Sequence, residues 1–220
     1  MPGGDRMEVD IREALRYIGA GAGDETLEAQ ARAVAREIKE RPRYTYRVFA
    51  LDPAGPSLPE LGLSLPGKTA GTMLKNCEQA ILLSCTLGLQ FDARLRAAQA
   101  RDMAKALILD GCGSALVEQG CDAAEREIAR RFPGLYLTDR FSPGYGDLPL
   151  SLQPEILSAL DAGRRLGIVV SDSLLMTPGK SVTAIIGLSR TPQMARIRGC
   201  GYCSMRETCA LRKGGNHCGL

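Results

Sequence analysis

A helical pattern over about residues 91–132 is the longest regular signal in this sequence and constrains its fold more than any other. The pattern is apolar on more than one face, and such a helix has to be covered by other elements on each of those faces. We therefore expect it to be the central, buried helix of the fold. Gly111-Cys112-Gly113 within it is expected to bend the helix or to let another backbone come close, because glycine lowers helix stability. The apolar surface is formed by Ala97, Ala100, Met103, Ala104, Leu107 and Ile108.

Shorter patterns predict the remaining helices and strands. The clearest helix follows Asp24, which is placed to cap it, and ends at Pro42. An apolar run at residues 80–86 is short enough to be a buried strand. Further helices are expected at about residues 9–18, 68–74 and 152–162, further strands at 43–51, 136–138, 167–173 and 181–188, and a proline-rich loop at 52–66.

These elements predict an α+β fold in which helices pack on a twisted mixed or antiparallel sheet. A chain of 220 residues is long enough to bury one substantial core. We expect a main body over residues 1–192 and a short Cys-rich C-terminal tail over residues 193–220.

The composition is that of an ordinary globular protein, with 45% hydrophobic and 24% charged residues, and it excludes a fibre or a disordered tail. The sequence has no apolar run of the roughly 18 residues needed to span a bilayer and no export signal at its start, so a cytoplasmic location is expected. In that reducing compartment the eight cysteines are expected to be thiols or metal ligands. Four of them, Cys77, Cys85, Cys112 and Cys121, lie in apolar segments and are expected to be buried and inert.

The segment Asp-Arg-Phe-Ser-Pro-Gly-Tyr-Gly-Asp-Leu-Pro at residues 139–149 is the most specific motif in the chain. It resembles the S-adenosylmethionine-binding activation domain of cobalamin-dependent methionine synthase, which carries Arg-x-x-x-Gly-Tyr followed by a proline. Residues 160–161 and 167–182, with a Pro-x-x-Ser-Val stretch at 178–182, resemble the helix and strand pair that follow this motif in the family. The segment 85–88 and the helix through Glu118 are similar to the free-standing members of that family. The resemblance extends from about residue 12 to residue 189 and implies the fold of that domain.

The resemblance implies a ligand site formed by Arg140, Ser142, Gly144 and Tyr145, with Glu118 as the ligand-binding acid. A guanidinium matches a ligand carboxylate in two parallel hydrogen bonds, glycine lets the backbone approach the ligand, and tyrosine offers a flat face and a hydroxyl. Ser142 stands where the family contacts the ligand mainly through its backbone. The alternative for Glu118 is a structural one, in which it is the partner of a buried arginine.

Two features of the family's site have no counterpart in this sequence. The acid that follows the first helix falls at Gly19, and the later tyrosine pair is missing after Ser189. Asp10, Asp24 and Tyr202 are the candidates to replace them.

The family's reaction transfers the sulfonium methyl of S-adenosylmethionine to Co(I), after a flavodoxin or ferredoxin-like donor has reduced Co(II). No protein base is needed for that step, so no catalytic residue is assigned, and the sequence has a single histidine, His217. The sequence also lacks an Asp-x-His-x-x-Gly motif, so the cobalamin is expected on a partner, either a methionine synthase or another corrinoid methyltransferase. The contrasting hypothesis is a non-catalytic ligand-binding or docking module.

Residues 62–69 match the spacing of a phosphate-binding P-loop, Gly-x-x-x-x-Gly-Lys-Thr. A true P-loop follows a buried strand, whereas this segment follows three prolines. Nucleotide binding is therefore the less favoured reading.

The C-terminal tail carries Cys200, Cys203, Cys209 and Cys218, and the close first pair is typical of metal sites. Four thiolates suit either tetrahedral zinc or a 4Fe–4S cluster, and the spacing does not separate these two. The alternatives are a reduced tail without metal and a zinc ribbon that contacts nucleic acid, which the lack of aromatic residues beside the basic ones disfavours.

Overall fold

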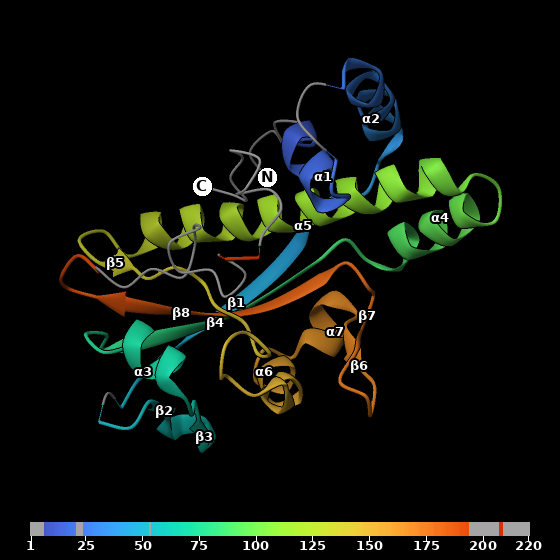
Figure 1. Ribbon diagram of the computed structural model, residues 1–220. Helices are drawn as coiled ribbons and strands as arrows, with labels where there is room; N and C mark the ends of the chain where they lie inside the picture. Colours follow the sequence, from blue (N-terminus) through green and yellow to red (C-terminus); the bar gives the residue numbers. More distant parts are fainter. Residues whose placement is uncertain (1–6, 21–23, 53, 194–206, 209–220) are drawn as a thin grey trace.

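A four-stranded antiparallel sheet forms the centre of the protein, with the strands in the order β1-β4-β8-β5 (Figure 1). The structure is a computed structural model that describes residues 7–20, 24–52, 54–193 and 207–208. Within these residues the predicted α+β fold is confirmed, and the main sheet is purely antiparallel. Its strands are β1 (Arg43–Ala50), β4 (Gln79–Thr86), β8 (Ser181–Ser189) and β5 (Tyr136–Leu137).

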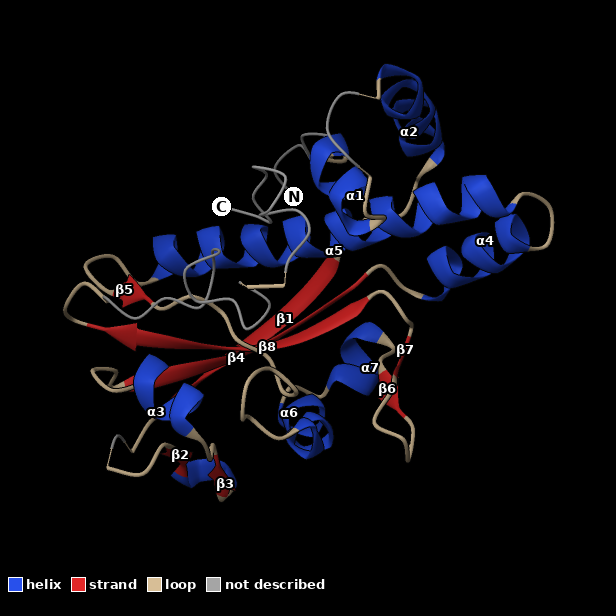
Figure 2. Cartoon of the chain, viewed as in Figure 1, coloured by secondary structure: helices blue, strands red, loops and turns tan. Residues whose placement is uncertain are grey.

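Helices cover both faces of the sheet (Figure 2). On one face lie α1 (Ile11–Tyr17), α2 (Glu25–Glu37), α4 (Leu89–Gln99) and α5 (Met103–Arg131). On the other lie α3 (Lys68–Met73), α6 (Gln153–Ala159) and α7 (Ala162–Leu166), with two small hairpins formed by β2 (Ser57–Leu58) and β3 (Leu63–Ser64), and by β6 (Val169–Val170) and β7 (Met176–Thr177). The two remaining elements are the 3₁₀ turns Pro59–Leu61 and Leu150–Leu152.

Strand β4 divides the interior into two hydrophobic clusters because successive side chains of a strand point to opposite faces. Ile81, Leu83 and Cys85 contribute to the cluster under α5, whereas Ala80 and Leu82 contribute to the cluster on the opposite face. A strand buried on both sides reads as a continuous apolar run, which is the pattern that the sequence shows at residues 80–86.

Helix α5 lies between the sheet and helices α1 and α2, which explains why its sequence is apolar on more than one face (Figure 1). Gly111 makes this packing possible, since a Cβ atom there would lie 2.4 Å from the carbonyl oxygen of Ala14 in α1. Gly113 faces the ring of Phe91 in the same way, at 2.5 Å. The expectation that another backbone comes close is confirmed at Gly111, whereas the close neighbour of Gly113 is a side chain.

The prediction of one helical stretch over residues 91–132 is wrong at one point. The chain turns between α4 and α5, and Asp102 caps the new helix by accepting a hydrogen bond from the backbone N–H of Lys105 at 3.0 Å. A capping carboxylate satisfies an N–H group that has no partner inside the helix, so it favours a new start there. The break therefore lies before Met103 and not at the glycines.

Two other predicted elements differ from the structure. The expected helix over 152–162 is divided at Asp161, whose positive φ of 52° ends α6 and starts α7. The expected strand over 167–173 is reduced to Val169–Val170, which pairs with β7 and not with the main sheet. The proline-rich segment 52–66 contains the β2–β3 hairpin where only a loop was expected.

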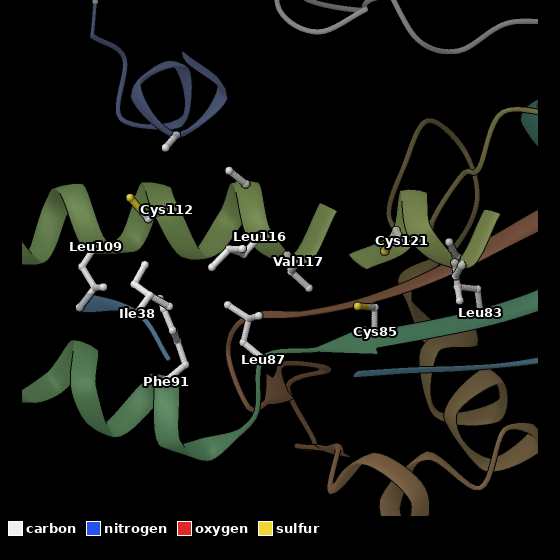
Figure 3. Packing of buried hydrophobic residues seen from close by; sticks show 14 of the residues in the cluster. Ile38, Leu83, Cys85, Leu87, Phe91, Leu109, Cys112, Leu116, Val117 and Cys121 are labelled. Atoms are coloured by element: carbon white, nitrogen blue, oxygen red, sulfur yellow. The ribbon is translucent and has the colours of Figure 1, made fainter. Parts of the chain in front are cut away.

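Cys77, Cys85, Cys112 and Cys121 are buried free thiols, as the sequence predicted. Figure 3 shows Cys85 on β4, beneath helix α5, and Cys121 on α5. Burial raises the pKa of the Cys77 and Cys112 thiols to about 11, so both are protonated near neutral pH. In the part of the chain that the structure describes, no helix has the length and apolarity to cross a bilayer.

Candidate ligand-binding site

The motif at residues 139–149, here called the ligand loop, leaves β5 and is fastened to the sheet by Phe141. The backbone N–H of Phe141 donates to the carbonyl of Ile185 at 3.1 Å, and the N–H of Ile185 donates back at 2.8 Å. The Phe141 ring is buried in the cluster on the α6 face of the sheet. The two residues on either side of this anchor, Arg140 and Ser142, therefore have fixed positions.

The ligand loop is a compact turn held by its own backbone. The N–H of Tyr145 donates to the carbonyl of Ser142 at 3.0 Å, and the N–H of Gly144 donates to the carbonyl of Leu148 at 2.9 Å. Gly144 has a φ of +85°, a conformation that other residues rarely adopt. Tyr145 is 41% exposed and lies at the surface.

Arg140 points from the ligand loop to helix α5, where three carboxylates surround it. Its Nη2 atom lies 2.5 Å from Oε2 of Glu118, its Nη1 atom lies 2.6 Å from Oδ1 of Asp122, and Nη1 also donates to Glu125. The Arg140 side chain is 8% exposed, whereas those of Glu118 and Asp122 are 34% and 43% exposed. The Arg140 cluster, defined as Arg140, Glu118, Asp122 and Glu125, is thus a buried cation beneath acids that reach solvent.

The charges of the cluster do not cancel. Burial alone would lower the pKa of Arg140, but the negative charges of Glu125 and Glu118 outweigh this effect and raise it. The guanidinium is therefore permanently charged, and three carboxylates face a single cation. This surplus of negative charge at a partly exposed surface suits a ligand that carries ammonium or sulfonium groups.

The structure brings Glu118 and Arg140 together, in the arrangement that the structural alternative for Glu118 anticipated. Both terminal nitrogens of Arg140 are already bonded to acids, so a ligand carboxylate could bind this guanidinium only by displacing one of them. The roles of Arg140, Glu118, Ser142, Gly144 and Tyr145 in binding a ligand stay predictions.

The sequence analysis missed Asp122 and Glu125 as members of the cluster. They follow Glu118 at i+4 and i+7, positions that lie on the same face of a helix. Three acids at this spacing on one face of a helix were a usable signal that this face meets a cation.

Tyr17, at the end of α1, is a third residue that the sequence analysis did not single out. Burial raises its pKa, and the negative charge of Glu118 raises it further. Helix α1 packs against α5, the helix that carries Glu118. The Tyr17 side chain is nevertheless 40% exposed, and the guanidinium of Arg16 lies over its ring at 4.5 Å. Gly19, where the family acid is missing, follows two residues later in a left-handed conformation.

Two of the three candidates to replace the missing acid and tyrosines cap helices in the structure. Asp10 and Asp24 cap α1 and α2 by accepting hydrogen bonds from the backbone N–H groups of Glu13 and Leu27. Tyr202, His217 and the four cysteines of the tail lie outside the described residues.

The segment that matches a P-loop does not form a phosphate site. Its helix α3 has six residues, and the carboxylate of Asp147 already accepts hydrogen bonds from the backbone N–H groups of Lys68 and Thr69, at 2.5 and 3.0 Å. β3 lies within this segment and pairs with β2, the two-residue strand that precedes the segment. In the part of the chain that the structure describes, no strand of the main sheet therefore leads into the segment, as a P-loop would require.

Comparison with known proteins identifies one similar architecture. No family model and no curated protein matches the sequence. Among solved structures, the chain is similar to a crystal structure of the MetH reactivation domain bound to AdoHcy, with a TM-score of 0.59 and 14% sequence identity. The similarity covers 96% of this chain and 84% of that one, so the two share a fold over almost their entire length.

Proposed function

We propose that this chain binds S-adenosylmethionine and serves as the accessory component that returns a methyl group to an inactivated corrinoid on a partner methyltransferase. The observation that carries the proposal is the Arg140 cluster, formed by a loop that also holds the exposed Tyr145, on a fold shared with a reactivation domain that was crystallised with AdoHcy. The expected partner is a cobalamin-dependent methionine synthase or another corrinoid methyltransferase.

The charge of the ligand complements the charge of the cluster. S-adenosylmethionine carries an ammonium and a sulfonium against one carboxylate, and Glu118, Asp122 and Glu125 provide the negative charge that these groups require. Gly144 would let the backbone reach the ligand, and the Tyr145 ring would supply a flat surface for its adenosine part. AdoHcy lacks the sulfonium charge and is expected to bind more weakly than the methyl donor.

The chain's own contribution to the reaction is positional. The corrinoid of the partner supplies the nucleophile that accepts the methyl group, and the sulfonium leaves as a neutral thioether. Residues of the ligand loop would hold the methyl donor in line with that nucleophile and exclude water from it. A flavodoxin or ferredoxin-like protein in the cytoplasm is the proposed source of the reducing electron.

Titration calorimetry with S-adenosylmethionine tests the binding step. We expect saturable binding by the wild-type chain and a loss of at least about tenfold in affinity for Arg140→Lys, because a lysine lacks the planar fork that holds two acids in place. Arg164→Lys is the matched control, since the Arg164 side chain is 75% exposed and forms an ion pair with Asp161, the residue that precedes α7. Equal affinity of Arg140→Lys and the wild type would remove the cluster from the site.

A methylation assay separates the catalytic proposal from the non-catalytic alternative. The protein is mixed with its corrinoid partner, a low-potential reductant and labelled S-adenosylmethionine, and the methylated corrinoid is followed by its absorbance. Label transfer that depends on this chain supports an accessory methyltransferase. Binding without transfer at any protein ratio would leave the docking or sensing module as the function.

The Cys-rich tail, residues 193–220, is proposed to bind a metal. Cys200, Cys203, Cys209 and Cys218 are proposed to hold zinc or a 4Fe–4S cluster, and a cluster would act as an electron relay toward the corrinoid. A visible absorption spectrum and metal analysis of anaerobically purified protein distinguish the two. Absence of both metals would assign the cysteines to a reduced tail.

A further inference from the structure

Asp147 connects the ligand loop to the start of helix α3, which is far away in the sequence. One carboxylate oxygen accepts the backbone N–H of Lys68 at 2.5 Å, and the other accepts the N–H of Thr69 at 3.0 Å. These are N–H groups of the first turn of α3, which have no partner within the helix. Asp147 lies two positions after Tyr145 and thereby attaches the turn that contains this tyrosine to α3.

Two glycines, one on each side, make this contact possible. A Cβ atom on Gly67 would lie 2.7 Å from Oδ1 of Asp147 and 2.9 Å from its backbone oxygen, and a Cβ atom on Gly146 would lie 2.6 Å from Oγ1 of Thr69. Both glycines also have positive φ, at +106° and +59°. The close approach of the two segments therefore depends on residues from both of them.

The carboxylate of Asp147 is ionised over the whole pH range in which the protein would work. Hydrogen bonds from Thr69 and Lys68 lower the pKa of Asp147 to about 2, so the carboxylate stays ionised at neutral and mildly acidic pH. A carboxylate that accepts backbone N–H groups at a helix start makes a charge-assisted bond, which is stronger than a neutral one.

We propose that Asp147 is a positioning residue for the proposed S-adenosylmethionine site, which orders the ligand loop before the ligand arrives. This inference rests on the proposed function. A loop that is ordered in the free protein loses less conformational entropy on binding, so the affinity for the ligand is higher. Without the contact, the turn from Ser142 to Leu148 keeps its own hydrogen bonds but loses its attachment to α3.

The variants break the contact from either side. Asp147→Ala removes the carboxylate, and Gly67→Ala pushes α3 away without changing the ligand loop. Gly62→Ala is the matched control for Gly67→Ala, because Gly62 also has a positive φ, of +61°, but no atom within 4 Å of the added Cβ. Asp102→Ala is the matched control for Asp147→Ala, because it removes a capping carboxylate from α5 at a distance from the loop.

The measurements are hydrogen exchange of the loop amides in the free protein and calorimetry with S-adenosylmethionine. Asp147→Ala and Gly67→Ala are expected to speed exchange at Gly144, Tyr145 and Leu148 and to weaken binding by about tenfold each, with no further loss in the double variant. In the methylation assay, KM for the methyl donor should rise while kcat changes little. The controls should lower thermal stability without any of these effects.

The outcomes separate this inference from the proposed function. Unchanged exchange in the loop, or unchanged affinity despite faster exchange, would overturn the positioning role of Asp147 while S-adenosylmethionine binding by the wild type stands. A wild-type protein that shows no heat with S-adenosylmethionine would overturn the proposed function, and the ligand part of this inference with it.

Discussion

Oδ1 of Asp122 lies 2.6 Å from Nη1 of Arg140, so the long helix α5 and the ligand loop meet through an ion pair. Replacing Arg140 by methionine keeps most of its volume but leaves three acids around an uncharged side chain. We expect this change to lower the free energy of unfolding by about 3 kcal/mol, the usual scale for removing one partner of a buried ion pair. Urea denaturation measures the loss.

The acids of the Arg140 cluster should contribute less to the free energy of unfolding than Arg140 does. Asp122→Asn is expected to change the unfolding free energy by less than about 1 kcal/mol, because the Asp122 side chain is 43% exposed and its interaction is screened by water. If Arg140→Met were as stable as the wild type, the cluster would have no structural role.

Tyr44 and Tyr46 of the edge strand β1 both donate to the carboxylate of Glu127 on α5, at 2.7 and 2.9 Å. Burial and the bond to Glu127 raise the pKa of Tyr44 to about 12. The folded protein therefore holds this proton more tightly than the unfolded chain, whose tyrosines titrate near about 10. The resulting stability is fully present below pH 10 and is lost as the pH rises toward 12.

Tyr44→Phe is expected to lower stability by about 1 kcal/mol near neutral pH and to reduce the alkaline loss of stability. Urea midpoints measured at a series of pH values test this, with Tyr136→Phe as the control because Tyr136 is 46% exposed. If the urea midpoints of the wild type and Tyr44→Phe fell equally at alkaline pH, the alkaline loss of stability would not come from Tyr44. The hydrogen bonds from Tyr44 and Tyr46 lower the pKa of Glu127, so its contribution is lost only as the pH falls through that lowered pKa.

Gly111→Ala should separate α1 from α5. The added Cβ would lie 2.4 Å from a backbone oxygen of Ala14, which cannot rotate away, so we expect a loss of about 2 kcal/mol or more. Gly71→Ala in α3 is the opposite case, since its Cβ meets no atom within 4 Å, and it should stabilise the protein by up to about 1 kcal/mol. Thermal unfolding of both variants gives the comparison, and equal melting temperatures would show that α1 tolerates displacement.

The protein should not bind ATP with Mg²⁺, although residues 62–69 have P-loop spacing. The backbone N–H groups of Lys68 and Thr69, which would have to hold a phosphate, are occupied by Asp147. Calorimetry with ATP is expected to give no saturable heat in the wild type, and Lys68→Ala should behave in the same way. Saturable binding that Lys68→Ala removes would restore the nucleotide hypothesis.

Much of the fold was predictable because it depends on local patterns. The apolar run of β4 and the Ser-Val start of β8 appear where the sequence predicted them. The helix capped by Asp24 begins as predicted but ends at Glu37, before the expected end at Pro42. The predicted helix boundaries were wrong where a single residue interrupts a helix although the hydrophobic pattern continues. Asp102 starts a new helix inside an apolar stretch, and Asp161 ends one by adopting a left-handed conformation.

The sequence by itself determined which residues form the ligand loop and which helix is central, since motif spacing and hydrophobic periodicity are properties of neighbours along the chain. Only the tertiary structure decided what these residues contact. Arg140 meets acids 15 to 22 positions away, and Asp147 meets α3 from 78 or 79 positions away. Such contacts depend on how the sheet orders its strands and on which distant segments it brings together, and residues that are neighbours along the chain do not determine either.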